Sequence, residues 1–305
     1  MLSYILRRLA GFLPVLFVIV SLSFFLMRLA PGGPFDQERA LPEQVRANIE
    51  ARYHLDEPLW RQYLRYLGEV ARGDLGPSFR YPDRSVNELL GLGFPVSLTL
   101  GVCALAVALA LGGTAGILAG LRRNSVIDYL TMSFALGGVS VPNFVLGPIL
   151  MLIFALGLGW LPVAGWETWR HLVLPSFTLG TFYAAYVARL TRAGMLEVIG
   201  QDFIRTARAK GLREGVVVLR HALPGAILPV VTYLGPASAA ILTGSVVVET
   251  IFSIPGIGRY FVSGALNRDY TMVLGTVVFY SVLLLLFNLV VDVLYAYLDP
   301  RVQIR

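Results

Sequence analysis

The sequence predicts an all-α integral membrane protein of about six transmembrane helices. Hydrophobic residues make up 56% of its 305 residues and charged residues only 14%, whereas a soluble domain carries about 25% charged residues. Long uncharged runs recur along the chain, and arginines gather in the short segments on one side of the predicted spans. This composition is that of a membrane protein.

The predicted spans are the uncharged runs that reach or approach the length of a membrane helix. A hydrocarbon core about 30 Å thick needs about 20 residues of α-helix. The six runs are residues 9–27, 96–121, 129–161, 172–188, 222–248 and 270–291. We expect a break in the third run, near Pro142, Pro148, Gly157 or Gly159, and an extension of the fourth through Arg189 and Arg192.

The first run is expected to remain as a span and not to be a cleaved signal peptide. Its apolar stretch is longer than the 7–15 residues or so of such peptides, and Arg28 closes it where small residues would precede a cleavage site.

The distribution of positive charge predicts the topology, because lysine and arginine stay on the cytoplasmic side of short loops. One side collects Arg7, Arg8, Arg122, Arg123, Arg189, Arg192, Arg205, Arg208, Lys210, Arg213, Arg220, Arg301 and Arg305. The short loops of the other side hold only Arg170, Arg259 and Arg268. Both termini are therefore expected in the cytoplasm, and the net charge of +6 is explained by topology without nucleic-acid binding.

The expected organisation is a first span (1–30), an external loop (31–95), a core of spans (96–300) with a cytoplasmic loop (197–224), and a tail (301–305). The external loop carries ten of the nineteen acidic residues and eight arginines, so it is solvated. Two short amphipathic helices are predicted in it from apolar spacing: Val45 with Ile49 after Pro42, and Trp60 with Leu64 and Leu67 after Pro58. They form either a cap on the spans or a contact surface for an external partner.

Several residues within the spans are candidates for packing or polar roles. Gly112, Gly116 and Gly120 repeat every four residues and allow another helix to approach closely, within the chain or in another subunit. Charge in hydrocarbon is costly, so we expect Arg28, Glu249 and Asp292 to be paired or to lie at an interface. Asn143 is a candidate for lining a pathway, and His171 and His221 are expected at the interfaces.

No catalytic or metal site is expected from the sequence. Cys103 is the single cysteine, and the chain lacks G-x-S-x-G, H-E-x-x-H and any Cys/His cluster with metal spacing. These absences disfavour an intramembrane enzyme. An ion-coupled secondary transporter stays open as an alternative, although the halves show no convincing repeat and Asp292 is the only plausible relay carboxylate.

The cytoplasmic loop 197–224 contains the most informative motif. It reads Asp202-Phe203-Ile204-Arg205-Thr206-Ala207-Arg208-Ala209-Lys210-Gly211-Leu212 and later Arg220-His221-Ala222-Leu223-Pro224. Phe203, Ile204 and Ala207 are predicted to form an apolar helix face, with Arg205 and Arg208 beside it and Gly211 as the helix stop. Such a helix fits a groove on a soluble partner, although an ordinary positive-inside loop also explains the charges.

This loop resembles that of the permeases of ABC importers, which has the form E-A-A, three residues, G, nine residues, I-x-L-P. Ala207, Gly211, Leu223 and Pro224 match, whereas the glutamate, the first alanine and the isoleucine are replaced by Arg205, Thr206 and His221. The variant is similar to the oligopeptide, dipeptide and nickel branch of that family.

Three further stretches extend the resemblance over essentially the whole chain. They are Tyr4–Arg8 with Met27–Gly32, Glu249–Gly258, and Asp292–Tyr295 with Leu298–Arg301. The length of the external loop and the stretch Ala265–Tyr270 are most similar to the B-type permeases of oligopeptide systems.

The resemblance implies a type I ABC importer permease in the bacterial inner membrane, forming half of a pathway for oligopeptides, or for dipeptides, nickel or another solute. It implies four kinds of partner: a second homologous permease, two ATP-binding subunits, an external peptide-binding protein and the lipid bilayer. ATP and Mg would bind the ATPase subunits, because the only lysine here, Lys210, is not in a G-K-S or G-K-T loop. The residues implied in coupling to an ATPase are Asp202, Phe203, Arg205, Thr206, Ala207, Arg208, Lys210 and Gly211.

Overall fold

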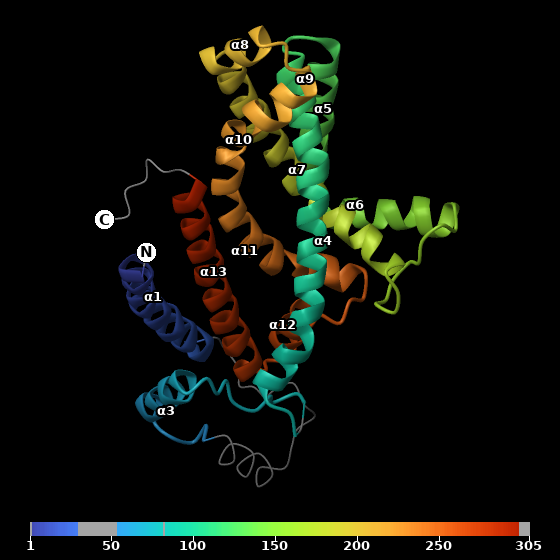
Figure 1. Ribbon diagram of the computed structural model, residues 1–305. Coiled ribbons are helices and arrows are strands. Elements are labelled where there is room, and N and C mark those ends of the chain that lie inside the picture. Colours follow the sequence, from blue (N-terminus) through green and yellow to red (C-terminus); the bar gives the residue numbers. More distant parts are fainter. Residues whose placement is uncertain (1, 30–53, 82, 299–305) are drawn as a thin grey trace. The chain divides into compact units, whose positions relative to one another are not determined.

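The computed structural model describes residues 2–29, 54–81 and 83–298 (Figure 1). The described residues form helices and no β-strand, which confirms the predicted all-α class. Contacts divide the chain into two units. Unit 1 comprises residues 1–96 and 256–285, and unit 2 comprises residues 97–255 and 286–305.

Unit 1 contains α1 (Leu2–Leu29), α3 (Leu59–Ala71), the start of α4 (Val86–Leu121), α12 (Ile257–Leu266) and most of α13 (Tyr270–Leu298). One core joins α1, α3 and α13 through Phe24, Tyr66 and Leu274. A second core joins the start of α4 to Ile257 and Met272. Unit 1 is therefore held by apolar contacts between segments far apart in the sequence.

The buried carboxylate of Asp269 connects the loop before α4 to the start of α13. It accepts hydrogen bonds from the Ser78 hydroxyl, from the Arg80 backbone N–H at 3.1 Å, and from the Met272 backbone N–H at 3.1 Å. A carboxylate at a helix N-terminus satisfies backbone donors that the helix cannot. Asp269 therefore caps α13 and fixes the loop with the same side chain.

The helix α3 confirms the predicted amphipathic helix after Pro58, but the predicted apolar face is partly wrong. Leu67 packs into the core, whereas Trp60 and Leu64 are exposed. The buried side is formed instead by Gln62 and Tyr66. The predicted helix at Val45 and Ile49 lies outside the described residues.

The second predicted span begins earlier than expected. The helix α4 starts at Val86 and not at Val96, so Pro95 lies inside the helix, and the helix begins within the segment predicted as the external loop. The Ser85 hydroxyl accepts a hydrogen bond from the Glu88 N–H at 3.2 Å, a typical N-terminal cap. Hydropathy located the point where the polar segment before Val96 ends. The start of α4 is set instead by the Ser85 cap, ten residues earlier.

Unit 2 is built around α7 (Arg170–Ile199), which contacts α5 (Val126–Ser140), α6 (Asn143–Leu150), α10 (Leu223–Ala226) and α11 (Leu228–Ile251). The fourth predicted run is thus extended through Arg189 and Arg192, as expected. Between α7 and α10 lie three short helices: α8 (Asp202–Ala209), α9 (Glu214–Val216) and the π-helix η2 (Val217–Ala222).

The third predicted run is broken at Pro142, as expected. The helix α5 ends at Ser140, and α6 begins at Asn143 and continues as the π-helix η1 (Met151–Gly157). Within unit 2, α6 runs across the direction of α5 (Figure 1). Proline removes a backbone donor and disfavours helix for the residue before it, which explains a break here.

The number of membrane spans stays a prediction. Among the described residues, α1, α4 and α13 contain apolar stretches long enough to cross a bilayer, and residues 214–226 with 228–241 form a fourth candidate that is bent by 55°. Residues 143–157 form a shorter apolar helix. The predicted number of about six is therefore not confirmed by helix length and composition.

Candidate coupling loop and polar sites

The helix α8 forms the core of the loop that the sequence predicts to be cytoplasmic. Asp202 lies in its first turn and Arg208 in its last, where each charge complements the helix dipole. Gly211 has a φ of +76°, and its N–H donates to the Arg208 carbonyl at 2.9 Å. A residue with a side chain is strained in this left-handed conformation, so Gly211 ends the helix as predicted.

The apolar residues of α8 mostly face their own chain. Ile204 and Ala207 are buried against Met195 of α7 and against Val217, Val218, Ala222 and Ala226. The prediction that these two residues face a partner together with Phe203 is therefore wrong. Only Phe203 of the three is exposed, with half of its surface accessible. An eight-residue helix is not stable alone in water, which explains why its apolar side is used for anchoring.

A bidentate ion pair holds the segment after α8. Arg208 donates to Glu214 through Nη2 at 2.6 Å and through Nε at 3.1 Å. The hydrogen bond raises the pKa of Arg208 and lowers the pKa of Glu214. Arg208 is therefore occupied within the loop and is less available to a partner than predicted.

The surface that is left for a partner includes Phe203, Arg205 and Thr206 of α8 and Lys210 directly after it, all exposed. Arg205 makes only a single contact of 3.4 Å with Asp202, and both side chains are solvent-accessible. Such exposed pairs contribute little to stability. We call these four residues the α8 surface.

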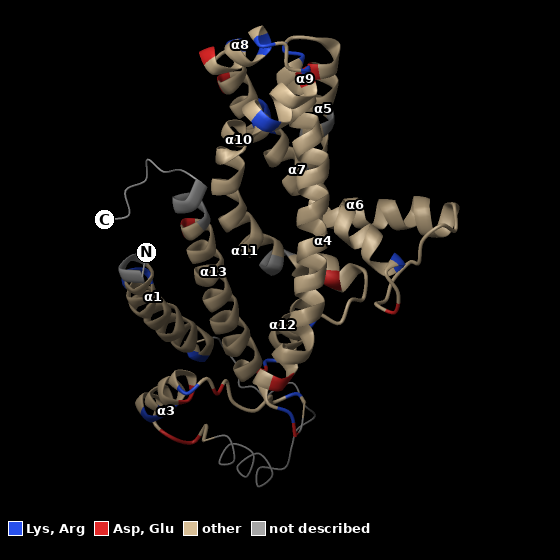
Figure 2. Cartoon of the chain, viewed as in Figure 1, with Lys and Arg blue, Asp and Glu red and all other residues tan. Residues whose placement is uncertain are grey.

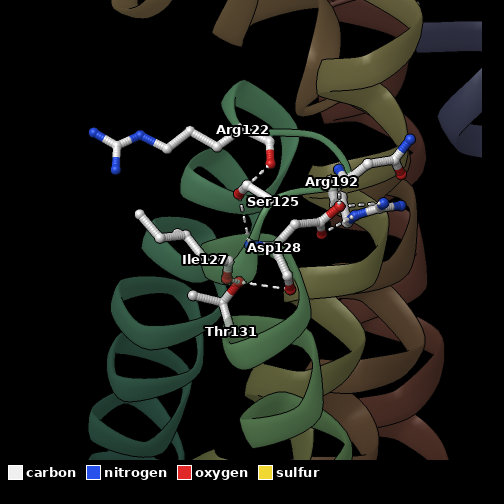
Figure 3. A network of polar contacts seen from close by, with 7 residues as sticks. Arg122, Ser125, Ile127, Asp128, Thr131 and Arg192 are labelled. Carbon is white, nitrogen blue, oxygen red and sulfur yellow. Dashed lines mark hydrogen bonds and ion pairs between the residues drawn. The ribbon is translucent and has the colours of Figure 1, made fainter.

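A second ion pair, which the sequence did not single out, connects α5 to α7 (Figure 3). Arg192 donates to the two carboxylate oxygens of Asp128, each at 2.7 Å, and the Asn124 backbone N–H donates at 3.0 Å. These hydrogen bonds lower the pKa of Asp128 to about 2, and the bond from Arg192 makes the largest contribution. The Ser125 cap with an acid three residues later was the sequence signal for this helix start.

The predicted polar candidates lie on three different helices. Glu249 is fully buried and accepts hydrogen bonds from the Ser97 and Ser245 hydroxyls, both at 2.7 Å, so of the two expectations for it, pairing and a position at an interface, the structure supports pairing. Asn143 begins α6, and its buried Oδ1 has no hydrogen-bond partner among the described residues. Asp292 is half-buried in α13.

The three glycines on α4 lie directly against α7. A Cβ atom added at Gly116 would lie 2.5 Å from the Thr191 Cβ, and one added at Gly120 would lie 2.6 Å from the Met195 Cβ. Gly112 approaches the Ala184 backbone in the same way. The sequence left open whether these glycines contact a helix of this chain or of another subunit. The structure shows that they contact α7 of the same chain.

The described residues contain no group of three His, Cys, Asp or Glu side chains arranged to hold a metal ion. The polar side chains of the loop carry charge and hydrogen bonds, and Figure 2 shows charges of both signs on α8 and beside it. The exposed charged side chains on and beside α8 are suited to contact with another protein.

Comparison with known proteins gives matches over nearly the full chain. Residues 112–304 match the family model described as a binding-protein-dependent transport system inner membrane component, and residues 1–94 match the model of the N-terminal region of such membrane components. The oligopeptide transport system permease protein OppB of Haemophilus influenzae is 53% identical, covering 99% of this chain and 100% of that protein. OppB of Escherichia coli K12 is 51% identical with the same coverage.

Two further relatives define the range of the similarity. The dipeptide transport system permease protein DppB of Bacillus subtilis is 46% identical, covering 100% of this chain and 99% of that protein. An inward-facing structure of the MetNI methionine ABC transporter aligns with a TM-score of 0.58 at 17% identity, covering 69% of this chain and 96% of that one. At this identity the structural match supports the fold alone.

Proposed function

This chain belongs to the family of binding-protein-dependent transport system inner membrane components, and we propose that it is one of two permease subunits of an ATP-driven oligopeptide importer. The 53% identity to an oligopeptide permease over nearly the full length of both proteins supports the substrate class. The second permease, two ATPase subunits and an external peptide-binding protein complete the proposed assembly. Both termini of this chain would lie in the cytoplasm.

The observation that carries the coupling role is the division of α8 into two sides. Ile204 and Ala207 fix the helix to α7 and η2, while Phe203 and Arg205 remain exposed. A force applied to the α8 surface is therefore passed to α7 and, through the residues after Val217, to α11. This is the arrangement that mechanical coupling between an ATPase and the spans needs.

Phe203 is the proposed anchor in a cleft of the ATPase subunit, and Arg205 and Lys210 would contact it at the rim. An exposed aromatic residue has a large apolar area to bury at an interface, whereas rim charges contribute less. ATP binding would bring the ATPase subunits together and favour one state of the permease pair. It does so only to the extent that the ATPase subunits bind the two states differently.

The test is ATP-dependent uptake of labelled trialanine by the complete complex in proteoliposomes, with Phe203→Asp and Gly211→Pro as variants. We expect both variants to insert into the membrane normally but to lose uptake. Lys210→Arg should retain uptake, because no phosphate chemistry depends on that ammonium. Leu266→Asp, a change at an exposed apolar residue at the end of α12, is the matched control. Normal uptake by Phe203→Asp would remove α8 from the coupling contact.

The alternative substrate is a dipeptide, which the 46% identity to a dipeptide permease supports. Competition of dialanine against labelled trialanine separates the two substrate classes. Sensitivity to vanadate is expected for an ATP-driven importer, and uptake that responds only to collapse of the proton gradient would instead support an ion-coupled transporter.

A further inference from the structure

In unit 2, Arg189 of α7 lies beside the apolar part of α4. The helix α4 contains an apolar stretch long enough to cross a bilayer, and Arg122 directly follows its end. A Cβ atom added at Gly112 would meet the residue two positions before Arg189, and one added at Gly116 would meet the residue two positions after it. These glycines precede Arg122 by ten and six residues, which is about 15 and 9 Å along a helix. Arg189 therefore lies well inside the apolar layer that α4 defines.

The side chain of Arg189 points away from the nearer end of the apolar layer. Its guanidinium lies over the ring of Tyr186, 4.9 Å from the ring centroid. Tyr186 is one turn earlier on α7, and α7 runs in the same direction as α4, so the guanidinium is directed away from the level of Arg122. A long cationic side chain near the end of a span usually extends towards the nearer water surface. Arg189 extends the other way, which requires a polar environment deeper in the layer.

Aromatic rings continue the surface from Arg189 along α7 and onto α11. The ring of Tyr186 stacks on that of Tyr233, with 5.7 Å between centroids and 23° between planes. Phe182, four residues before Tyr186, lies 5.5 Å from it by the same measure. Residues at spacings of three and four share one side of a helix. Phe182, Tyr186, Arg189 and Tyr233 thus form one surface, which we call the α7–α11 face.

The α7–α11 face is accessible in this chain. Arg189 is exposed, and the three aromatic residues are half-buried. The side of α7 that meets α4 is closed instead, as the burial of Ala188 and Thr191 shows. Arg192, one turn after Arg189, is held by Asp128 at 2.7 Å and has a structural role within unit 2. Stacking on a ring orients the guanidinium of Arg189 without using its N–H donors.

The position of this arginine restricts what can lie against the α7–α11 face. A guanidinium among lipid tails costs at least about 2.5–3.5 kcal/mol at the centre of a membrane helix. Charged side chains inside spans therefore nearly always face the interior of a bundle or a water-filled cavity, and they mark the routes of substrates. The tyrosine hydroxyls of the same face also favour a wet environment over lipid tails.

We propose that the α7–α11 face lines the route of the imported peptide, with Arg189 donating to its C-terminal carboxylate and the rings of Tyr186 and Tyr233 contacting its side chains. The guanidinium has the geometry for two parallel hydrogen bonds to a carboxylate. The rings offer apolar surface without hydrogen bonds that would select one side chain. This inference rests on the proposed import function and names residues of this chain that contact its substrate.

The first test measures water access by cysteine labelling of the complete complex in nanodiscs, in a Cys103→Ser background without ATP or binding protein. The probe is a water-soluble cationic methanethiosulfonate. Tyr186→Cys should react at least about tenfold faster than Leu111→Cys, since a thiol in apolar surroundings forms little thiolate. Leu111 is the matched control because it is exposed beside Gly112 and lines an apolar pocket. Arg189→Cys should react like Tyr186→Cys and replaces it if that variant does not assemble.

Slow labelling at both positions of the α7–α11 face, at the rate of Leu111→Cys, would overturn the proposal. It would mean that lipid or a helix of the second permease covers this face.

The second test measures protection of the Tyr186→Cys thiol by trialanine or its C-terminal amide. The amide should need at least about a tenfold higher concentration for equal protection, because it lacks the charge-assisted hydrogen bonds to Arg189. Adding Arg189→Gln should make the two peptides equal. Adding Arg61→Gln, which removes an exposed arginine stacked on Trp60, should leave their difference unchanged.

Absence of protection by either peptide, or a preference for trialanine that survives Arg189→Gln, would overturn the assignment of the carboxylate to Arg189. Neither labelling experiment uses ATP or uptake. A failure of the import function would therefore be seen separately, as a wild-type complex without ATP-driven uptake.

Discussion

The anchoring of α8 by Ile204 can be tested quantitatively. The substitution Ile204→Ala removes three carbon atoms from a fully buried position. At about 0.8 kcal/mol per carbon, with a further cost for the cavity, the loss falls in the range of about 2–5 kcal/mol, and we take about 3 kcal/mol. Ile204 and Ala207 are the only residues of α8 that are buried, so nearly all of this loss should weaken the docking of the helix.

A loss of about 3 kcal/mol corresponds to about a hundredfold increase in local opening, since about 1.4 kcal/mol is a factor of ten. Hydrogen exchange of the peptide 202–211 in the permease pair without its ATPase subunits, where Phe203 is exposed, measures this opening directly. We expect protection to fall about a hundredfold in Ile204→Ala and to stay unchanged in Phe203→Ala, which changes an exposed residue of the same helix. Both variants should lose uptake, for different reasons.

A change in protection of less than about threefold in Ile204→Ala would refute this reasoning. It would mean that the contacts of Ile204 with Met195 and Val217 do not hold α8, and that another contact fixes the loop. Equal loss of protection in both variants would also contradict it, because an exposed ring cannot anchor the helix to its own chain.

Three further predictions concern unit 2. Gly116→Val should lower stability by about 1–3 kcal/mol in thermal unfolding, because the new Cβ meets Thr191, while Gly113→Val, three residues earlier in the same helix, should be tolerated, since nothing lies within 4 Å of that position. Asp128→Asn should remove an acid-dependent part of the stability: the pKa of about 2 in the folded protein is below the ordinary value of 3.8, so this stabilisation is present above about pH 4 and is lost as the pH falls towards 2. Denaturant unfolding between pH 3 and 7 should show a weaker pH dependence in the variant, and an unchanged profile would contradict the ion pair. Glu249→Ala should destabilise by about 1–3 kcal/mol, because two buried hydroxyls lose their acceptor, and Glu249→Gln should retain most of the stability; equal losses in both would argue against the hydrogen bonds.

Local sequence features predicted well the properties that depend on neighbours in the chain. The break at Pro142 follows from a missing backbone donor, and the end of α8 at Gly211 follows from a conformation that glycine alone adopts without strain. The match of the loop 197–224 to a family motif identified the class of protein from about twenty residues. Uncharged runs located most of the long helices, although the start of α4 was misplaced by ten residues because a cap, not hydropathy, sets it.

Properties that depend on distant contacts were predicted less well. The apolar spacing in α8 is compatible with either side facing a partner, and only the packing of Met195 and Val217 against Ile204 decides which side is used. The same holds for α3, where the buried side is formed by Gln62 and Tyr66 and the exposed side includes Trp60. Periodicity identifies a helix with two unlike sides but contains no information on what lies against each.

The sequence alone determined that this protein is a helical membrane component, which branch of transport proteins it resembles, and where the loop lies for which we propose an ATPase contact. These follow from hydropathy, charge and local motifs, which each segment carries by itself. Only the tertiary structure decided that Asp128 pairs with Arg192, that Glu249 is buried between two serines, and that Tyr186 stacks on Tyr233. Each of these depends on residues separated by many positions in the chain, and their proximity arises only when the helices pack.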